Sequence, residues 1–456
     1  MDAWLKAALD YVPRWLEFQH RQSELPGVVA AVADKGKLAG EWAFGHADLA
    51  NGIPLTPRHR FRVASHSKSF TAAGIMKLRE QGKLALDHAV GRYVRGLHKS
   101  VASATIAQLL SHSAGIIRDG TDAGQWQDRR KFLNARELRA ALKDPPVIEA
   151  NTRFKYSNHG YGLLGLVIEV VTGTAYVEWI ARAVVGPAGL NETLPDMPRT
   201  DAVRLARGHT ATLLTGKRMI IPGDNPTNAL APATGFVSTA RDMTRFFAQL
   251  DPAAKRSILS AASRREMIRR QWRIPHAALE RHYGLGIISG ATGGWEWFGH
   301  SGGFQGTVSQ TAVLRERSVT VSVLTNASDG LAGVWLEGVI QIFRSFHKHG
   351  APARRVRDWT GRWWGLWGAA DLVPMGERVL VATPHWFNPF LDASEIVVTA
   401  KDRGRVDQAN GFYSHGEAVR LVRDRRGRVA SVWLAGRKAL PEAEAAREIK
   451  ARYASA

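Results

Sequence analysis

The chain has 456 residues, of which 45% are hydrophobic and 23% charged, a composition typical of a globular protein with room for more than one domain. It contains no cysteine, which excludes disulfide bonds, thiolate metal sites and cysteine catalysis. The net charge of +21 is spread at similar density along the chain, so we expect neither a nucleic-acid partner nor a membrane partner.

The first residues follow an amphipathic pattern that predicts a helix broken at Pro13. They do not combine a basic segment with an apolar one, as a signal peptide would. The most apolar stretch, residues 161–171, contains Glu169 and is too short to span a bilayer. We therefore expect a cytoplasmic protein, or a periplasmic one if a signal peptide has been removed.

Two apolar runs, residues 27–34 and 38–44, flank Lys35-Gly36 and predict a β-hairpin. A helix is predicted next, from Ser67 to about Glu80. At its start, Ser65-His66-Ser67-Lys68 places a hydroxyl and an amine three residues apart on one helix face. The Lys68 ammonium can then reach the Ser65 hydroxyl, and a serine needs such a neighbour to become a nucleophile.

The Ser-x-x-Lys spacing is weak evidence when it stands alone. A second copy, Ser345-Phe346-His347-Lys348, lies at the end of another predicted helix, where an exposed helix end explains it. The motif at Ser65 therefore needs support from other parts of the chain.

From Ser67 to about residue 271 the pattern is helical and rich in loops. Helices are expected at residues 105–110, 135–142, 161–171 and 240–250. Tyr156-Ser157-Asn158 is the only Tyr-x-Asn in the chain and precedes the helix expected at Tyr161. In an extended segment residues i and i+2 face the same way, so the phenol and the amide can enter one pocket.

Strand patterns then return. They are expected at residues 283–288, 295–298, 307–314 and 319–325, followed by a helix at 333–346. His300-Ser301-Gly302 is a His-x-Gly motif and lies between strands. Residues 299–303 also match the Gly-x-Ser-x-Gly elbow of α/β-hydrolases, but that elbow needs a helix after its serine, and a strand is expected here.

Residues 351–355 form a predicted linker, after which the character of the chain changes. Six of the 15 tryptophans lie beyond it, and short strands alternate with glycine turns. Gly361-Arg362-Trp363 resembles the start of a lipocalin-like barrel. We predict an α+β domain at residues 1–350, in which strands from both ends of the domain form one antiparallel sheet with a helical lobe beside it. A small all-β barrel is predicted at residues 351–456.

The three motifs together resemble a known family. Ser-x-x-Lys, Tyr-x-Asn and His-x-Gly, in that order, are similar to the motifs of the serine β-lactamase-related hydrolases: class C β-lactamases, DD-peptidases, D-aminopeptidases and related esterases. Residues 109–115, 187–190 and 235–240 also resemble family segments. The resemblance spans about residues 25–345 and implies a β-lactamase/DD-peptidase-like fold for the first domain.

The resemblance implies a role for each motif residue. Ser65 would attack an acyl carbon, Lys68 would take its proton, and Tyr156 would act as phenolate or proton shuttle and activate the deacylating water. Asn158 would bind a substrate amide. The backbone N–H groups of Ser65 and Gly303 would form the oxyanion hole, with Gly302 and Gly303 allowing close approach of the substrate.

His300 departs from the β-lactamase pattern, which usually has lysine at this position. A mostly neutral imidazole holds a substrate carboxylate poorly, which favours neutral or amine-ended substrates. D-aminopeptidase-like relatives carry histidine here and often append a barrel. We therefore expect a serine hydrolase acting on amide or peptide bonds, with a preference for D-amino-acid or other non-standard substrates. A carboxylesterase, an acyltransferase and a non-catalytic β-lactamase-like binding protein are the alternatives.

No cofactor and no metal site are predicted, and His112 is interpreted as a structural residue after Leu110 rather than a base. The expected partner is a small molecule or short peptide. The sequence leaves the oligomeric state open, a homo-oligomer included.

Overall fold

The computed structural model describes residues 1–198, 203–410 and 413–454. It divides into two compact units, one of residues 25–336 and one of residues 1–24 with 337–456. The boundary differs from the predicted one after residue 350, because the first helix and most of the helix before the linker group with the barrel residues.

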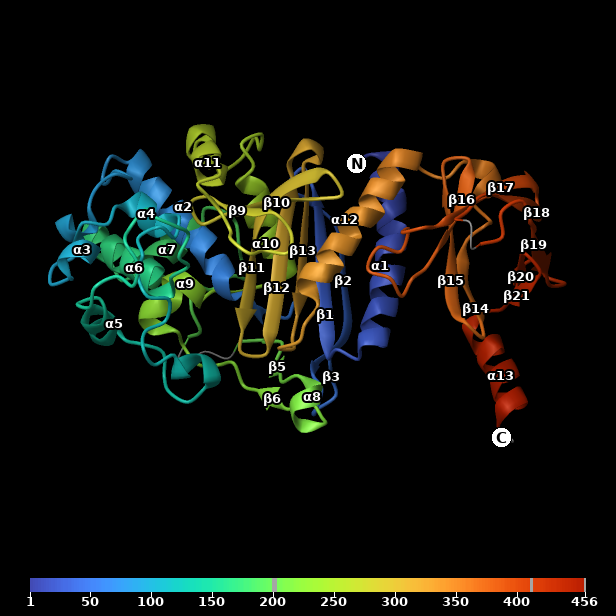
Figure 1. Ribbon diagram of the computed structural model, residues 1–456, viewed down its shortest axis with the longest axis horizontal. Helices are drawn as coiled ribbons and strands as arrows, with labels where there is room; N and C mark the ends of the chain where they lie inside the picture. The colour runs from blue at the N-terminus through green and yellow to red at the C-terminus, as the bar shows by residue number, and fades with distance from the viewer. Residues whose placement is uncertain (199–202, 411–412, 455–456) are drawn as a thin grey trace. The chain divides into compact units, whose positions relative to one another are not determined.

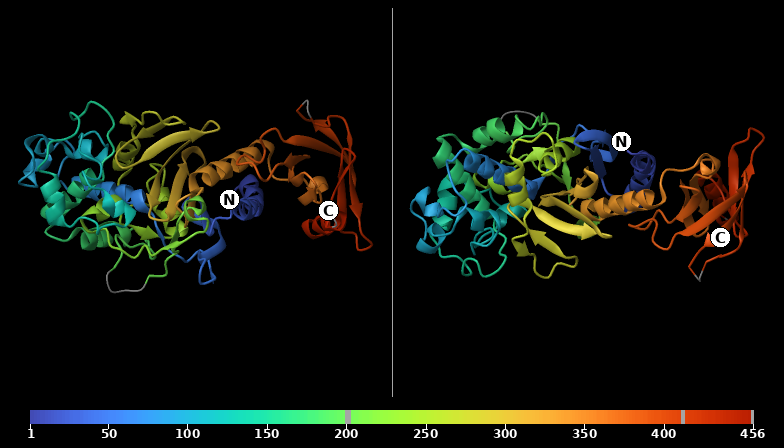
Figure 2. Two further views of the ribbon diagram at one scale, coloured as in Figure 1. Left: turned by 60° about the horizontal axis from the view of Figure 1, so that its bottom comes forward. Right: turned by 90° about the horizontal axis from the view of Figure 1, so that it is seen from above.

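The larger unit has the predicted α+β architecture. Its described residues form a nine-stranded antiparallel sheet in which the strands from the two ends of the unit lie side by side, blue β1 and β2 next to yellow β11 to β13 (Figures 1 and 2). In spatial order the strands are β3 (Ile53–Pro54), β2 (Lys37–Asp48), β1 (Gly27–Asp34), β13 (Val319–Thr325), β12 (Thr307–Leu314), β11 (Trp295–Phe304), β10 (Ile288–Thr292), β9 (Arg281–Tyr283) and β8 (Trp272–Arg273).

A helical lobe lies beside this sheet (Figure 1). Its helices are α2 (Ser67–Glu80), α3 (Lys99–Ala102), α4 (Ile106–Leu110), α5 (Ala135–Ala141), α6 (Asn158–Thr172), α7 (Tyr176–Ile180) and α9 (Ala231–Thr234). Helix α10 (Ala240–Gln249) packs on strands β1, β2, β12 and β13, and α11 (Ala261–Ile268) follows it. Two short pairs, β4 (Phe61–Arg62) with β7 (Val237–Ser238) and β5 (Gly208–His209) with β6 (Ile220–Ile221), and helix α8 (Thr212–Thr215) complete the unit.

Helix α2 is buried along almost its whole length. The ring of Phe70 stacks between those of Phe236 and Phe246, with centroid distances of 4.2 and 3.8 Å. Lys68 and Ala72 meet Gly286, where a Cβ would lie 2.8 Å from the Lys68 carbonyl oxygen and 2.6 Å from the Ala72 Cβ. This packing holds the start of α2, and therefore Ser65, in a fixed place.

Several predicted boundaries were wrong. The strand expected at 295–298 continues to Phe304, so His300 lies inside β11 and not between strands. The strand expected at 283–288 is interrupted, because Gly286 has a φ of +70° and its N–H donates to Leu110 O at 3.2 Å. Helix α6 begins at Asn158 rather than Tyr161, since Ser157 caps it by accepting the Gly160 N–H at 2.9 Å. Pro13 lies inside a continuous helix α1 (Ala3–Ser23).

In the second unit, described residues 361–439 form an eight-stranded antiparallel sheet that is nearly closed into a barrel, as predicted. Its strands are β14 (Gly361–Gly365), β15 (Gly368–Met375), β16 (Arg378–Ala382), β17 (Ser394–Ala400), β18 (Arg403–Gln408), β19 (Ala418–Arg423), β20 (Val429–Leu434) and β21 (Arg437–Ala439). Trp364 and Leu440 bridge its first and last strands through backbone hydrogen bonds of 2.7 and 2.9 Å. Helices α12 (Ala332–His349) and α13 (Glu442–Tyr453) flank it in the chain.

Among the described helices, none has by itself the length and apolar character needed to cross a membrane. One pair, residues 158–172 and 176–185, meets both criteria only when taken together and is bent by 80°.

Candidate active site

Ser65 stands on a tight turn between strand β4 and helix α2. Residues Ala64–His66 form a 3-10 turn in which Ala64 adopts a φ of +49°, a conformation that costs a non-glycine residue energy. Ser67 stabilises the turn by donating to the Ala64 carbonyl and accepting the Phe236 N–H at 3.0 Å. The Ser65 side chain is left partly exposed while its neighbours in the turn are buried.

The predicted partners of Ser65 lie in hydrogen-bonding contact with it. The Lys68 Nζ lies 3.2 Å from the Ser65 Oγ, and the Tyr156 hydroxyl donates to the same Oγ at 2.7 Å. Lys68 Nζ also lies 4.6 Å from the centroid of the Tyr156 ring. The structure therefore brings together three residues that are up to 91 positions apart in sequence.

Lys68 is completely buried and has two further acceptors. Its Nζ donates to Asn158 Oδ1 at 2.7 Å and to the Ala233 carbonyl oxygen at 2.8 Å. A neutral amine has two N–H donors and one lone pair. When the two shorter bonds use both donors, the lone pair faces Ser65, which is the arrangement a general base needs.

Burial shifts the proton affinities of the two neighbours of Ser65 in opposite directions. It lowers the pKa of Lys68 well below its ordinary value; the Asp119 charge opposes this shift, and the Arg118 charge adds to it. Burial also raises the pKa of Tyr156, which the hydrogen bond to Ser65 offsets only in part. A neutral lysine can accept the Ser65 proton, whereas a neutral tyrosine can donate one.

Asp119 is a site residue that the sequence did not reveal. Its carboxylate accepts the Asn158 Nδ2–H at 2.6 Å and the Trp126 Nε1–H at 2.8 Å, and it pairs with Arg118 at 3.1 Å. Because a carboxylate only accepts, Asn158 must turn its amide nitrogen to Asp119 and its oxygen to Lys68. Asp119 occupies no recognisable motif and lies 39 residues before Asn158, so only the fold could reveal it.

His300 lies in the buried layer beside the site rather than open to solvent. It is 1% exposed, its Nδ1–H donates to Ser301 O at 2.7 Å, and its Nε2 accepts the Tyr283 hydroxyl at 3.0 Å. Burial, and next the proximity of His66, lower the pKa of His300 well below its ordinary value. Both ring nitrogens are occupied and the ring is neutral, so it provides no cation for a substrate carboxylate.

Gly302 and Gly303 lie on strand β11, and Gly302 packs against Val63, the residue before the Ser65 turn. A Cβ on Gly302 would lie 2.2 Å from the Val63 carbonyl oxygen, so only glycine allows this approach. Gly303 is exposed and has nothing within 4 Å of its Cβ position. The position beside Gly303 is therefore open, whereas the one beside Gly302 is filled by the Val63 carbonyl.

Two further candidates in the sequence were His112 and the Gly-x-Ser-x-Gly match at residues 299–303. His112 accepts the Ser157 N–H at 3.1 Å through Nδ1, which is a structural contact that orients the Tyr156 segment. Residues 299–303 lie inside strand β11 and are not followed by a helix, so they form no α/β-hydrolase elbow. Among the described residues, no group of three or more His, Asp or Glu side chains is placed to hold a metal ion.

Comparison with known proteins shows similarity over most of the chain. A family model described as Beta-lactamase matches residues 3–334. Penicillin-binding protein 4* of Bacillus subtilis (strain 168) is 33% identical over 170 residues, which are 37% of this chain and 37% of that protein. The matched segments span little more than a third of the length of such curated relatives.

Two solved structures show similar folds. The octameric penicillin-binding protein homologue from Pyrococcus abyssi is 21% identical, with a TM-score of 0.65 and coverage of 95% of this chain and 99% of that one. The D-amino acid amidase from Ochrobactrum anthropi SV3, complexed with L-phenylalanine, is 25% identical, with a TM-score of 0.63 and coverage of 74% and 98%.

Proposed function

The chain belongs to the beta-lactamase family, and from this premise we propose that it hydrolyses amide bonds through an acyl-enzyme on Ser65. The observation that carries the proposal is the double contact of the Ser65 Oγ, with Lys68 Nζ at 3.2 Å and the Tyr156 hydroxyl at 2.7 Å. One neighbour takes a proton and the other gives one, which is what acyl transfer from an amide requires.

Acylation would then run in two proton-coupled steps. The Ser65 Oγ attacks the carbonyl carbon while its proton passes to Lys68 Nζ, and the negative carbonyl oxygen is stabilised by the N–H groups of Ser65 and Gly303. The C–N bond breaks as the Tyr156 hydroxyl protonates the leaving amine. Lys68 returns the proton to Tyr156, which restores the neutral phenol.

Hydrolysis of the acyl-enzyme would use Lys68 and Tyr156 in the same roles. A water molecule loses a proton to Lys68 as its oxygen bonds to the acyl carbon, and the Ser65 Oγ leaves with a proton from Tyr156. Lys68 then returns that proton to Tyr156, so the site ends the cycle in the protonation state in which it began, with the acid released as product.

We propose amides of D-amino acids, or short peptides with a free amine, as the substrates. Support comes from His300, which is neutral and buried and cannot hold the carboxylate of a penicillin or of a peptide C-terminus. Further support comes from the similarity to a D-amino acid amidase. An uncharged amide group avoids the need for a cation at this position.

A substrate panel tests the proposal. It comprises D- and L-aminoacyl p-nitroanilides, p-nitrophenyl esters and a chromogenic cephalosporin, each assayed with wild type, Ser65→Ala and Tyr156→Phe. We expect turnover of D-aminoacyl anilides and its loss in Ser65→Ala. Tyr156→Phe should keep more activity on nitrophenyl esters than on anilides, because nitrophenolate leaves without a proton.

Ser345→Ala is the matched control, since Ser345 has the same Ser-x-x-Lys spacing in the last turns of α12, where Lys348 is exposed. It should leave every rate unchanged. Turnover of esters alone would contradict the amidase proposal and indicate a carboxylesterase. Full activity of Ser65→Ala would show that Ser65 is not the nucleophile.

A further inference from the structure

Arg62 is a buried charged residue that the proposed proton transfers do not use. It is 1% exposed and precedes Ser65 by three residues. Burial lowers its pKa to about 10 and the Asp196 and Asp224 charges raise it, so the guanidinium stays charged at neutral pH. A buried charge is costly unless its contacts compensate for it, so the identity of those contacts is informative.

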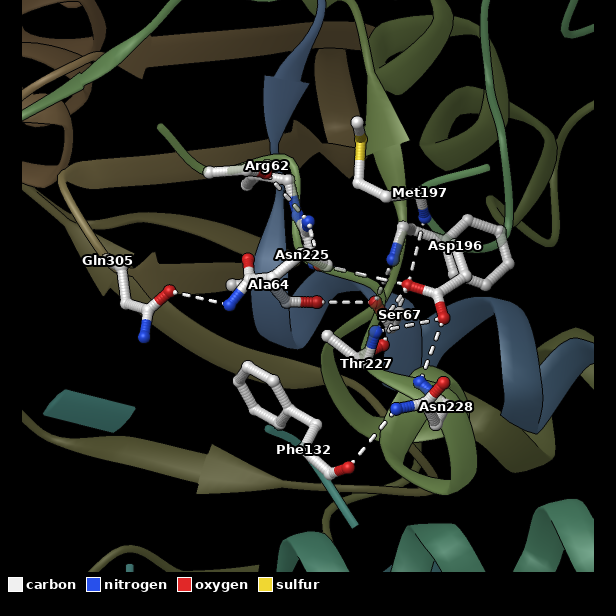
Figure 3. A network of polar contacts seen from close by, with 12 residues as sticks. Arg62, Ala64, Ser67, Phe132, Asp196, Met197, Asn225, Thr227, Asn228 and Gln305 are labelled. Carbon is white, nitrogen blue, oxygen red and sulfur yellow. Dashed lines mark hydrogen bonds and ion pairs between the residues drawn. The ribbon is translucent and has the colours of Figure 1, made fainter. Parts of the chain in front are cut away.

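The first group of contacts surrounds the guanidinium (Figure 3). Arg62 Nη1 donates to the carbonyl oxygens of Gly223 at 2.9 Å and Asn225 at 2.8 Å, and Nη2 lies 4.0 Å from Asp196. The guanidinium carbon lies 4.1 Å from the centroid of the Phe304 ring. Arg62 thus joins a loop at residues 223–225 to the residue that follows Gly303.

The second group of contacts reaches the turn between strands β11 and β12. Asn225 donates through Nδ2 to Gln305 Oε1 at 3.2 Å, as Figure 3 shows. Thr307 donates through Oγ1 to the Arg62 carbonyl oxygen at 3.0 Å. Phe304, Gln305 and Thr307 are therefore all attached to Arg62, directly or through Asn225.

These attachments connect the two halves of the proposed oxyanion hole. The segment after Arg62 holds Val63, the strained Ala64 and Ser65, while the residue before Phe304 is Gly303. An oxyanion hole works only when both N–H groups point at one oxygen from about 3 Å, so a small shift of either segment weakens it.

We propose that Arg62 is a positioning residue that sets the separation between the Ser65 turn and Gly303, and thereby the geometry of the oxyanion hole. This inference rests on the proposed acyl transfer at Ser65. It predicts that Arg62 acts on transition-state stabilisation while leaving ground-state binding and the protonation of Lys68 unchanged.

The test compares Arg62→Met and Arg62→Lys with wild type. For each we would measure kcat, KM, the pH profile and the affinity for an arylboronic acid, whose tetrahedral adduct with Ser65 places an oxygen in the oxyanion hole. We expect kcat and boronate affinity to fall together by roughly 10²-fold in Arg62→Met, with KM and the acid limb of the pH profile unmoved. Arg62→Lys should recover part of the loss.

Arg264→Met is the matched control. Arg264 is also buried and also donates to loop carbonyl oxygens, including Ala254 O at 3.2 Å, but it shares no partner with Arg62. Its removal should lower the melting temperature without changing kcat or boronate affinity.

Should Arg62→Met fail to fold, two other variants test the connection. Thr307→Val removes the hydrogen bond to the Arg62 carbonyl oxygen, and Phe304→Leu removes the ring beside the guanidinium together with its contacts to Trp126 and Phe132. Each should lower kcat and boronate affinity in parallel by severalfold.

Three results would overturn the inference: unchanged boronate affinity in folded Arg62 variants, a loss confined to KM, or a moved acid limb, which would mean that Arg62 acts through Lys68. Failure of the proposed function is distinguishable. If wild type hydrolyses nothing in the panel, boronate binding to Ser65 and its dependence on Arg62 can still be measured.

Discussion

At the residue scale, burial separates the tasks of the two side chains that contact Ser65. Lys68 and Tyr156 are an amine and a phenol with similar ordinary pKa values. In the site the pKa of Lys68 falls and that of Tyr156 rises, because each loses water as a partner for its charged form. These directions support the proposed roles of Lys68 as base and Tyr156 as acid.

Replacing Asp119 should shift the pH dependence of activity. The Asp119 charge raises the pKa of Lys68, and the proposed mechanism requires neutral Lys68, so the acid limb of kcat/KM should report that pKa. In Asp119→Asn the charge is absent, the pKa of Lys68 falls further, and the limb should move to lower pH. We also expect roughly tenfold lower kcat, since Asn158 loses its fixed orientation.

Trp126→Phe is the control for that experiment. It removes a hydrogen bond of 2.8 Å to the same carboxylate but changes no charge, so the limb should stay where it is in wild type. A limb that stays in place or rises in Asp119→Asn would contradict the electrostatic coupling between Asp119 and Lys68.

Lysine at position 300 should not convert the protein into a penicillin hydrolase. In His300→Lys the Tyr283 hydroxyl and Ser301 carbonyl lose their partner and a charge enters a buried layer, at a cost of about 1–3 kcal/mol for each unsatisfied group. We expect a lower melting temperature in calorimetry and no turnover of a chromogenic cephalosporin. Tyr283→Phe breaks only one of the two hydrogen bonds of His300 and should be destabilised less. A His300→Lys variant as stable as wild type, or more stable, would refute this account.

Sequence reasoning at this scale could group residues that belong to a motif. Ser65, Lys68, Tyr156 and Asn158 could be grouped because their motifs occur in a specific order, and the structure brings their side chains into contact. Asp119 could not be found, because its role depends on a hydrogen bond to a residue 39 positions away.

At the element scale, strand β11 depends on two adjacent glycines that have different surroundings. Gly302→Ala should push the strand away from the Ser65 turn, because a Cβ would lie 2.2 Å from the Val63 carbonyl oxygen. We expect a loss of kcat/KM of roughly 10²-fold and a destabilisation of about 1–3 kcal/mol, measured by kinetics and denaturant unfolding.

Gly303→Ala is the matched comparison, since its Cβ would meet nothing within 4 Å. Its stability should stay close to that of wild type. Comparable destabilisation of the two variants would mean that this strand needs the backbone conformational freedom of glycine, and not the close approach to Val63.

Element boundaries show what periodicity cannot predict. The position of α2 followed from its start motif and apolar spacing. The break at Gly286 did not, since it arises where the chain turns to pack on Lys68 and Ala72. Pro13 likewise stays inside α1, where Val12, Trp15 and Leu16 on the same helix are completely buried.

At the scale of the whole molecule, the first helix belongs to the unit that contains the barrel. Tyr11 donates to Asp371 Oδ2 at 3.0 Å, and Gln19 donates through Nε2 to Pro384 O at 2.7 Å. These partners are 360 and 365 residues apart. A pattern read over neighbouring residues carries no information on such pairs, so the sequence predicted both folds but assigned the first helix to the other unit.

Tyr11→Phe should therefore weaken one unit alone. Asp371 is completely buried, and besides Tyr11 it accepts two hydrogen bonds of 2.8 Å from Arg362. Losing the Tyr11 donor should cost about 1–3 kcal/mol.

Calorimetry with and without an arylboronic acid identifies the unfolding transition of residues 25–336, because a ligand bound at Ser65 raises the midpoint temperature of that transition. Tyr11→Phe should lower the midpoint temperature of the other transition and leave kcat unchanged. Tyr413 is exposed, so Tyr413→Phe should lower the midpoint temperature of neither transition. Movement of the boronate-sensitive transition in Tyr11→Phe would show that the two units do not unfold separately.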